Sequence, residues 1–204
     1  MFGVAGMIIA VVATVLGGQV GSIGTLILVL LIGGGIGLVV ARHVAMTAMP
    51  ELVAILHSFV GAAAVLVGIV SHLEPGSLIG LELLIHKIEI VLGVFIGAYT
   101  FTGSVIAFLK LRGSIAGKPL TLPLRHQLNI LLVLVSVLLG AWFVNGTLQE
   151  QIIYLLIILS IAGLLGIHMI MAIGGADMPV VVSMLNSIPD GLQPLPDSCF
   201  PMIY

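Results

Sequence analysis

The amino-acid sequence predicts an all-α membrane protein, a polytopic bundle of about six transmembrane helices followed by a non-helical tail. Of its 204 residues, 60% are apolar and only 7% are charged, whereas soluble domains contain about 25% charged residues. The mean hydropathy is +1.36, and the apolar residues form long runs separated by glycine, proline and charged residues. Such runs are typical of membrane-spanning helices rather than of a soluble core.

Charge, cysteine content and motifs exclude several classes of function. A net charge of −2 gives no support to nucleic-acid binding. The single cysteine, Cys199, excludes an intramolecular disulfide and a metal site built from several cysteines. No Gly-x-Gly-x-x-Gly motif follows a strand, so we expect no nucleotide-binding fold in this chain. The N-terminus has no basic signal-peptide region and starts within an apolar run, which indicates a missing upstream segment or an abrupt helix start.

The first two apolar segments are separated by a glycine-rich turn. Residues 2–16 are short for a span, because about 17–25 residues are needed to cross the hydrocarbon core. Residues 23–40 are long enough, and Gly33 and Gly37 have the small-xxx-small spacing that lets helices approach closely in lipid.

The third segment, 51–72, contains a buried-looking histidine. Pro50 and Glu51 suit a helix start, because proline needs no donor there and an acid favours the positive end of the helix dipole. Positions spaced as on one helix face hold small residues and one imidazole; we call this set the His57 stripe, and it comprises His57, Gly61, Ala64, Gly68 and Ser71. A stripe of small residues packs against another helix, so His57 is predicted to face the bundle.

The fourth segment has a polar start, made of Glu82, His86, Lys87 and Glu89, and continues as the apolar run 90–109. It carries a second stripe at the same spacing, made of Gly93, Gly97, Thr100, Ser104 and Ala107. We expect it to be the partner surface of the third segment. The fifth and sixth segments, 128–144 and 152–173, are joined by a short loop. Trp142 and Tyr154 bracket this loop and are predicted to be interfacial aromatic residues.

The distribution of basic residues predicts the orientation. They gather in the loops after the second and fourth segments, namely Arg42, Lys110, Arg112, Lys118 and Arg125. Two helices separate these loops, so both lie on one side, and the positive-inside rule places that side in the cytoplasm or matrix. The sixth segment ends on the same side, so Asp177 is predicted to face the cytoplasm.

The stretch 174–187, GGADMPVVVSMLNS, combines a glycine pair, an acid, a proline and an amide. A carboxylate at a membrane junction costs free energy unless it is solvated, hydrogen-bonded or used. Counting about 1.5 Å per residue, His57, His168 and Asn186 all lie roughly 8–13 Å below the inner boundary. The three residues therefore share a level, but the sequence does not show that their side chains meet.

Each candidate residue also has a structural interpretation. His57 is the main functional candidate, because an imidazole titrates near neutral pH and an ionisable group inside a bundle is rarely incidental. For His168 we favour a simple hydrogen bond to a neighbouring helix. Asp177 is either a functional carboxylate or a helix N-cap, and Asn186 can orient an imidazole or a water. The remaining histidines, near the membrane ends, are predicted to be interfacial: His43, His72, His86 and His126.

Four stretches resemble one family in order along the chain: MPELVAILHSFVG at 49–61, FTGSV at 101–105, KPLTLP at 118–123 and the 174–187 stretch. Over residues 1–187 the chain resembles the membrane domain of the beta subunit of proton-translocating NAD(P) transhydrogenase. The resemblance implies a Re/Si-specific enzyme in which hydride passes between NAD(H) and NADP(H) on separate soluble domains. It also implies that the membrane domain couples this transfer to proton translocation.

By the same resemblance, His57 is the proton-pathway residue, while Asp177 and Asn186 take part in coupling and in the pathway. The implied partners are the alpha subunit, the NADP(H)-binding domain and membrane lipid, in a dimer of the alpha–beta complex. The implied location is the bacterial inner membrane. This chain itself is expected to bind no cofactor or metal and to be inactive in isolation.

The chain also departs from the family pattern. The family begins with one more helix, and after residue 187 it continues through membrane helices into a soluble domain. Here residues 188–204 contain four prolines, which exclude a regular spanning helix. We therefore expect a partial transmembrane domain at 1–187, a divergent tail at 188–204, and truncation at both ends. Two alternatives remain: another ion-coupled transporter, which would need a polar substrate cavity, or a non-catalytic membrane fragment.

Overall fold

The computed structural model describes residues 2–16, 22–74, 76, 78–120 and 124–174, and within these ranges every regular element is a helix. Five helices are long and apolar enough to cross a membrane, and α1 is a shorter apolar helix. The all-α membrane bundle predicted from the sequence is confirmed. The predicted tail, 188–204, lies outside the described residues. The chain forms two compact units that divide after Met46.

The first unit contains α1 (Phe2–Leu16) and α2 (Ile23–His43). Ser22 caps α2, because its Oγ accepts a hydrogen bond from the backbone N–H of Thr25 at 3.4 Å. No residue of α2 is buried within the described structure. A Cβ atom added to Gly33 or Gly37 would meet no described atom within 4 Å. The close helix contact expected at these glycines is therefore not made by the part of the chain that the structure describes.

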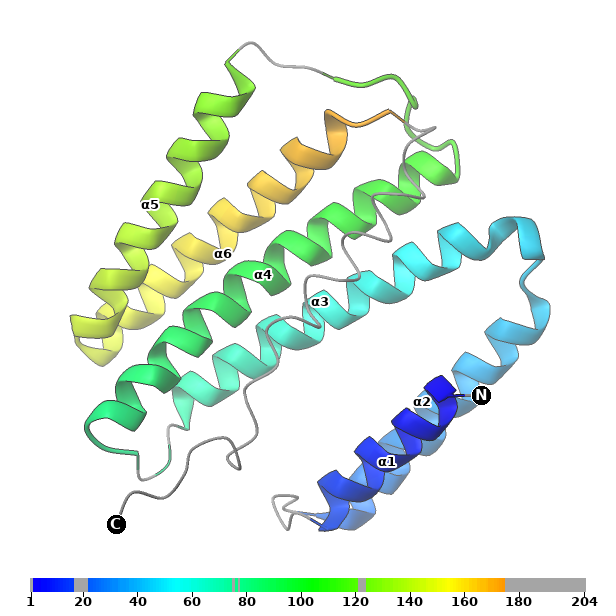
Figure 1. Cartoon of the computed structure of the whole chain (residues 1–204), viewed down its shortest axis with the longest axis horizontal. Coiled ribbons are helices and arrows are strands. Elements are labelled where there is room, and N and C mark those ends of the chain that lie inside the picture. The colour runs from blue at the N-terminus through cyan, green and yellow to red at the C-terminus, as the bar shows by residue number, and fades with distance from the viewer. Residues whose placement is uncertain (1, 17–21, 75, 77, 121–123, 175–204) are drawn as a thin grey trace. The chain divides into compact units, whose positions relative to one another are not determined.

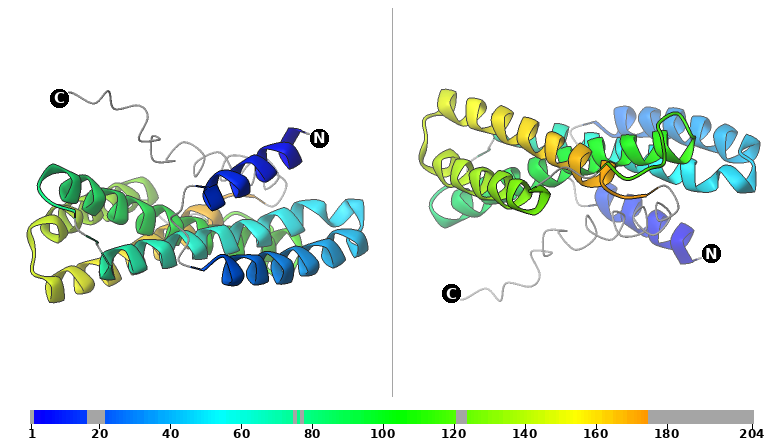
Figure 2. Two further views of the ribbon diagram at one scale, coloured as in Figure 1. Left: turned by 90° about the horizontal axis from the view of Figure 1, so that it is seen from below. Right: turned by 90° about the horizontal axis from the view of Figure 1, so that it is seen from above.

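The second unit follows a short 3-10 turn, η1 (Met46–Ala48), and contains four long helices. These are α3 (Met49–Leu73), α4 (Leu81–Leu111), α5 (Arg125–Asn145) and α6 (Leu148–Met171). Helix α4 packs mainly against α3 on one side and α6 on the other, and α5 packs on α6 (Figure 1). The four long helices of this unit run lengthwise along one another (Figure 2).

The helix ends follow local chemistry. Helix α3 has proline in its first turn and Glu51 beside it, as expected. Helix α6 begins with a capping box in which the Glu150 carboxylate accepts from Thr147 N and Oγ1, both at 2.8 Å. Helix α4 begins at Leu81, so the polar residues predicted at the start of the fourth segment form its first turns.

Glycine allows the backbones of α3 and α4 to touch. A Cβ atom on Gly61 would lie 2.6 Å from Phe101 N and 2.7 Å from Gly97 O. A Cβ atom on Gly97 would lie 2.8 Å from Gly61 O. The predicted pairing of the two stripes is therefore correct at its centre. Gly93 differs from the expectation, because a Cβ atom there would meet no described atom within 4 Å.

Glycine also allows a close approach of the α4 and α6 backbones. A Cβ atom on Gly166 would lie 2.5 Å from Tyr99 O and 3.2 Å from Gly103 N. The Thr102 hydroxyl donates to Gly163 O at 2.8 Å, which ties the two helices at this close approach. Such hydrogen bonds and small residues replace the hydrophobic driving force that helices lack between themselves in lipid.

We expect Gly61→Ala to lower the free energy of unfolding by about 1–3 kcal/mol. The added methyl group would collide with backbone atoms of α4, which cannot turn aside as a flexible side chain can. Reversible denaturation of the detergent-solubilised protein, followed by helical circular dichroism, measures the change. Gly93→Ala is the matched control on the partner helix and should leave the stability unchanged or slightly higher. Equal effects of the two substitutions would contradict the proposed backbone contact.

Candidate functional site

His57 is buried at the interface of α3 and α4. Its side chain is 6% exposed, on the helix face that also buries Ala54, Ser58 and Gly61. Gly61 touches α4 at Gly97 and Phe101, and Ala54 packs in one cluster with Ala107 of α4. His57 lies between these two contacts, so the structure confirms that it faces the bundle.

Two hydroxyl groups of α4 belong to the same region. Ser104 lies between Phe101 and Ala107, at the level of His57, and Thr100 lies one turn earlier. Both side chains are buried, and Thr100 Oγ1 and Ser104 Oγ have no hydrogen-bond partner among the described residues. We call His57, Thr100 and Ser104 the His57 site. The sequence had presented the two hydroxyl residues only as small packing residues; their polarity was the available signal.

A buried hydroxyl group that lacks a partner is costly, at about 1–3 kcal/mol. A hydroxyl can rotate to donate or to accept, and an imidazole has one nitrogen of each kind when neutral. Together these groups can hold a proton or a water in a place that is otherwise apolar. The chemistry that these groups support is therefore proton binding and proton transfer.

His168 lies near the same level but faces a different helix. Ile170, two residues later, shares the cluster of Ala54 and Ala107. The ring of His168 turns toward α5, where its Nδ1 is 2.7 Å from Asn129 Oδ1. Because an amide oxygen only accepts, Nδ1 carries the proton in this pair. This is the hydrogen bond to a neighbouring helix that we predicted, and the structure does not bring His168 against His57.

Three basic residues predicted to lie in loops belong to helix ends, namely Arg42 in α2, Arg125 in α5 and Lys110 in α4. Lys110 differs most from the prediction. Instead of lying in a loop, this residue is in the last turn of α4 and is only 4% exposed. Its Nζ donates to the carbonyl oxygens of Ile170, Met171 and Ile173 at 3.2, 2.9 and 2.8 Å. The ammonium group therefore caps the end of α6, where helix carbonyls have no partner in the helix and the dipole is negative.

The end of α6 leads directly into the stretch with the predicted acid. Leu120 N also donates to Met171 O at 2.9 Å, so the segment after α4 holds this end as well. Gly174 is the last described residue, three positions before Asp177. Asp177 and Asn186 lie outside the described residues, so their predicted roles stay predictions.

The remaining histidines divide into two groups. His43 Nδ1 lies 2.8 Å from Val39 O of its own helix, and His126 is exposed beside Arg125. Their interfacial location stays a prediction. His72 differs, because it is 6% exposed and packs on the ring of Phe143 with centroids 5.2 Å apart. Burial of this histidine results from α5 and α6 closing over the end of α3.

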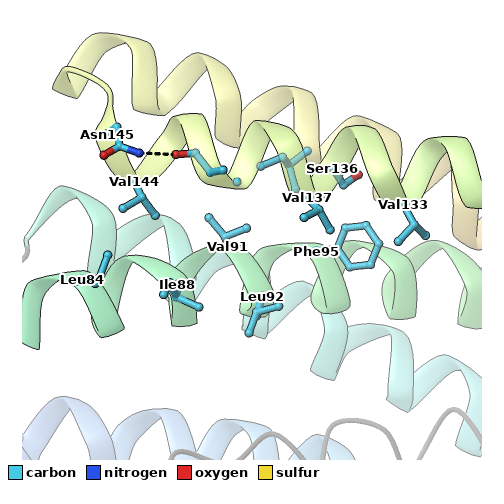
Figure 3. A pocket seen from close by; sticks show the side chains of 13 residues that line it. Leu84, Ile88, Val91, Leu92, Phe95, Val133, Ser136, Val137, Val144 and Asn145 are labelled. Carbon is cyan, nitrogen blue, oxygen red and sulfur yellow. Dashed lines mark hydrogen bonds between the residues drawn. The ribbon is translucent and has the colours of Figure 1, made fainter. Parts of the chain in front are cut away.

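A cavity of about 560 Å³ lies between α4 and α5 (Figure 3). Apolar side chains such as Val91, Leu92 and Phe95 line it, together with Ser136 and Asn145. Both polar side chains bond to carbonyl groups of their own helix, Ser136 to Leu132 O and Asn145 to Ala141 O, each at 2.9 Å. The cavity suits an acyl chain or another helix and gives no support to a polar substrate site.

Comparison with known proteins places the chain beside one family. The family described as NAD(P) transhydrogenase beta subunit matches residues 1–192. Two curated relatives, both named NAD(P) transhydrogenase subunit beta and both from Rhodospirillum rubrum, are each 48% identical over 189 residues. The match covers 91% of this chain and 40% of each relative, so the chain spans about 40% of the relatives' length.

We expect Lys110→Met to loosen the end of α6, because three carbonyl oxygens lose a charged donor. Hydrogen bonds to charged groups contribute about 1.5–3 kcal/mol, so the free energy of local opening at the Ala172 and Ile173 amides should fall by about that amount. Hydrogen–deuterium exchange measures it. Lys118→Met, which removes an exposed lysine from the following segment, is the control. Identical exchange in both variants would rule out the capping role.

Proposed function

The chain belongs to the NAD(P) transhydrogenase beta-subunit family, and we propose that it forms the proton-translocating membrane part of such an enzyme. The intact complex would transfer hydride between NAD(H) and NADP(H), with Re/Si specificity, and couple the transfer to proton movement. Both nucleotides would bind on other domains of the complex. The alpha subunit and the NADP(H)-binding domain are the proposed partners, in a dimer surrounded by lipid.

The observation that carries this proposal is the burial of His57 between α3 and α4. An ionisable side chain inside a membrane bundle is expensive and marks an ion or proton path by default. Its place beside two buried hydroxyl groups, those of Thr100 and Ser104, supports a proton-transfer role over simple packing. An imidazole ordinarily titrates near neutral pH, so it can accept and release a proton under physiological conditions.

Coupling requires that the proton affinity or the accessibility of His57 differ between two states of the complex. In one state His57 would take a proton from one side, and in the other it would release the proton to the opposite side. The hydroxyl groups of Thr100 and Ser104 would orient the water that exchanges it. Asn186 would tune access to His57, and Asp177 would face the docking surface of a soluble domain, where nucleotide state is sensed.

The proposed location is the bacterial inner membrane, with the basic segments on the cytoplasmic side. Lys110 lies within α4, but the loop after α4 carries the exposed residues Arg112 and Lys118. Arg125 follows at the start of α5. Arg42 lies in the last turn of α2. This distribution supports the orientation by the positive-inside rule. The end of α6, held by Lys110, would then face the cytoplasm.

We predict that His57→Ala, in the intact complex reconstituted into vesicles, abolishes proton-coupled reverse transhydrogenation and proton pumping. The change removes the only titratable group of the His57 site. His43→Ala removes an imidazole that bonds within its own helix and should retain activity, which controls for the general loss of a histidine. Pumping at the wild-type rate by assembled His57→Ala protein would refute the assignment.

Asp177→Asn tests the second proposed residue. If Asp177 is a coupling group, the substitution should weaken the link between hydride transfer and proton movement more than it weakens membrane insertion, because the amide keeps the shape but loses the charge. The ratio of protons moved to hydride transferred, measured beside the amount of inserted protein, separates the two. Normal coupling with reduced insertion would favour the N-cap interpretation.

A further inference from the structure

A second group of polar side chains lies at the other end of α4, far from the basic segments. Here α3 ends, α4 begins, and α5 turns into α6 (Figure 1). A cavity of about 230 Å³ at this end is lined by the polar side chains of His72, His86, Lys87 and Gln151, together with apolar residues. The lining comes from α3, α4 and α6, so packing of the bundle creates the cavity.

Buried polar atoms in the wall of this cavity favour the binding of water there. His72 is 6% exposed, and its Nε2 is buried without a hydrogen-bond partner among the described residues. Gln151 is 4% exposed, and its side-chain amide N–H donates a hydrogen bond to Gly146 O at 2.9 Å. A buried nitrogen that bonds to nothing is costly. The volume is far above the roughly 10–15 Å³ that one water needs on the same measure, and polar cavities of this kind hold water.

A second cavity, of about 410 Å³, continues along the groove between α3 and α4. Most of its lining is apolar, and Ala64 lies at its far end. Its polar residues are Ser71, Glu89 and His86, and it shares His86 with the first cavity. His86 therefore stands between the two, with its Nε2 3.4 Å from Ser71 O. The far end of this second cavity, at Ala64, lies seven residues from His57, which is about 10 Å along a helix.

We propose that these two cavities form a water-filled entrance by which protons approach the His57 site from the side opposite the basic segments, as far as the contact between Gly61 and Gly97, with His86 as the relay between them. This inference rests on the proposed proton translocation and deepens it. The imidazole of His86 would take a proton from water in one cavity on one ring nitrogen and release the proton of its other nitrogen to water in the next. The ring is then neutral but in its other tautomer, and rotation of the ring or proton exchange with water restores the first tautomer, so no other reactant is needed.

The charged and titratable groups around His86 fit this role. From α4, Glu89 lines the second cavity and attracts a proton toward it, while Lys87 lines the first. Lys87 Nζ donates a hydrogen bond to Val144 O of α5 at 3.0 Å, which holds the ammonium group in the lining of the first cavity. From α3 comes His72, and α6 supplies the uncharged Gln151. The Glu150 carboxylate is held in the capping box by Thr147.

The route is tested in the intact complex, reconstituted in vesicles with a cysteine-free background. In Gln151→Cys protein, the new thiol should react with the small cation 2-aminoethyl methanethiosulfonate added on the side opposite the basic segments. Ile158→Cys places a thiol in the dry core, at a side chain that is 0% exposed, and should stay unreactive. Modification of the assembled Gln151→Cys protein should then slow proton pumping at least tenfold.

A substitution provides the second arm. His86→Leu should slow pumping by about tenfold and make it less sensitive to the pH on that side, whereas His126→Leu, an exposed histidine at the other end, should pump normally. Equal reactivity of the two thiols, full pumping after modification, or wild-type pumping with an unchanged pH profile in His86→Leu would each overturn the route. If vesicles of the unmodified protein pump no protons, the proposed function is refuted. The labelling of Gln151→Cys then still shows whether the cavity is open to water.

Discussion

The direct backbone contact between α3 and α4 determines where the rest of this bundle lies. At Gly61 and Gly97 the two backbones lie so close that a Cβ atom on either glycine would be less than 3 Å from backbone atoms of the other helix. This distance sets the register, and the register places His57 opposite Ser104. A second close approach, at Gly166, fixes α6 on the other side of α4. Helix α4 is thereby held on two faces by glycine, and the polar groups of the His57 site are enclosed.

A membrane bundle must also satisfy the polar groups at its helix ends, because no water is available in the hydrocarbon core. Helix α4 supplies a lysine at each of its ends for this purpose. Lys87 donates to Val144 O near the end of α5, and Lys110 donates to three carbonyl oxygens at the end of α6. The two ammonium groups are bound to backbone, so they help to hold the bundle together.

These constraints connect structure to the proposed function. A rigid, glycine-packed interface keeps an imidazole buried, and the cavities along α3 and α4 lead toward it from one end. At the other end, Lys110 holds the last turn of α6, from which the chain enters the stretch with Asp177. The helix that encloses the proposed proton site therefore also holds the end of α6, which precedes in sequence the segment proposed to sense nucleotide state. A shift of α4 relative to its neighbours would reach both places at once.

The sequence alone determined the helical membrane class, the bounds of most helices and the burial of His57, because hydropathy and small-residue spacing are local patterns. It also supported the family, through motifs in order along the chain. Only the tertiary structure moved Lys110 from a loop into a buried cap, paired His168 with Asn129, and buried His72 beside a polar cavity. Each of these depends on which carbonyl, amide or ring lies opposite a side chain. Such contacts join helices distant in sequence, and the register that sets them comes from packing.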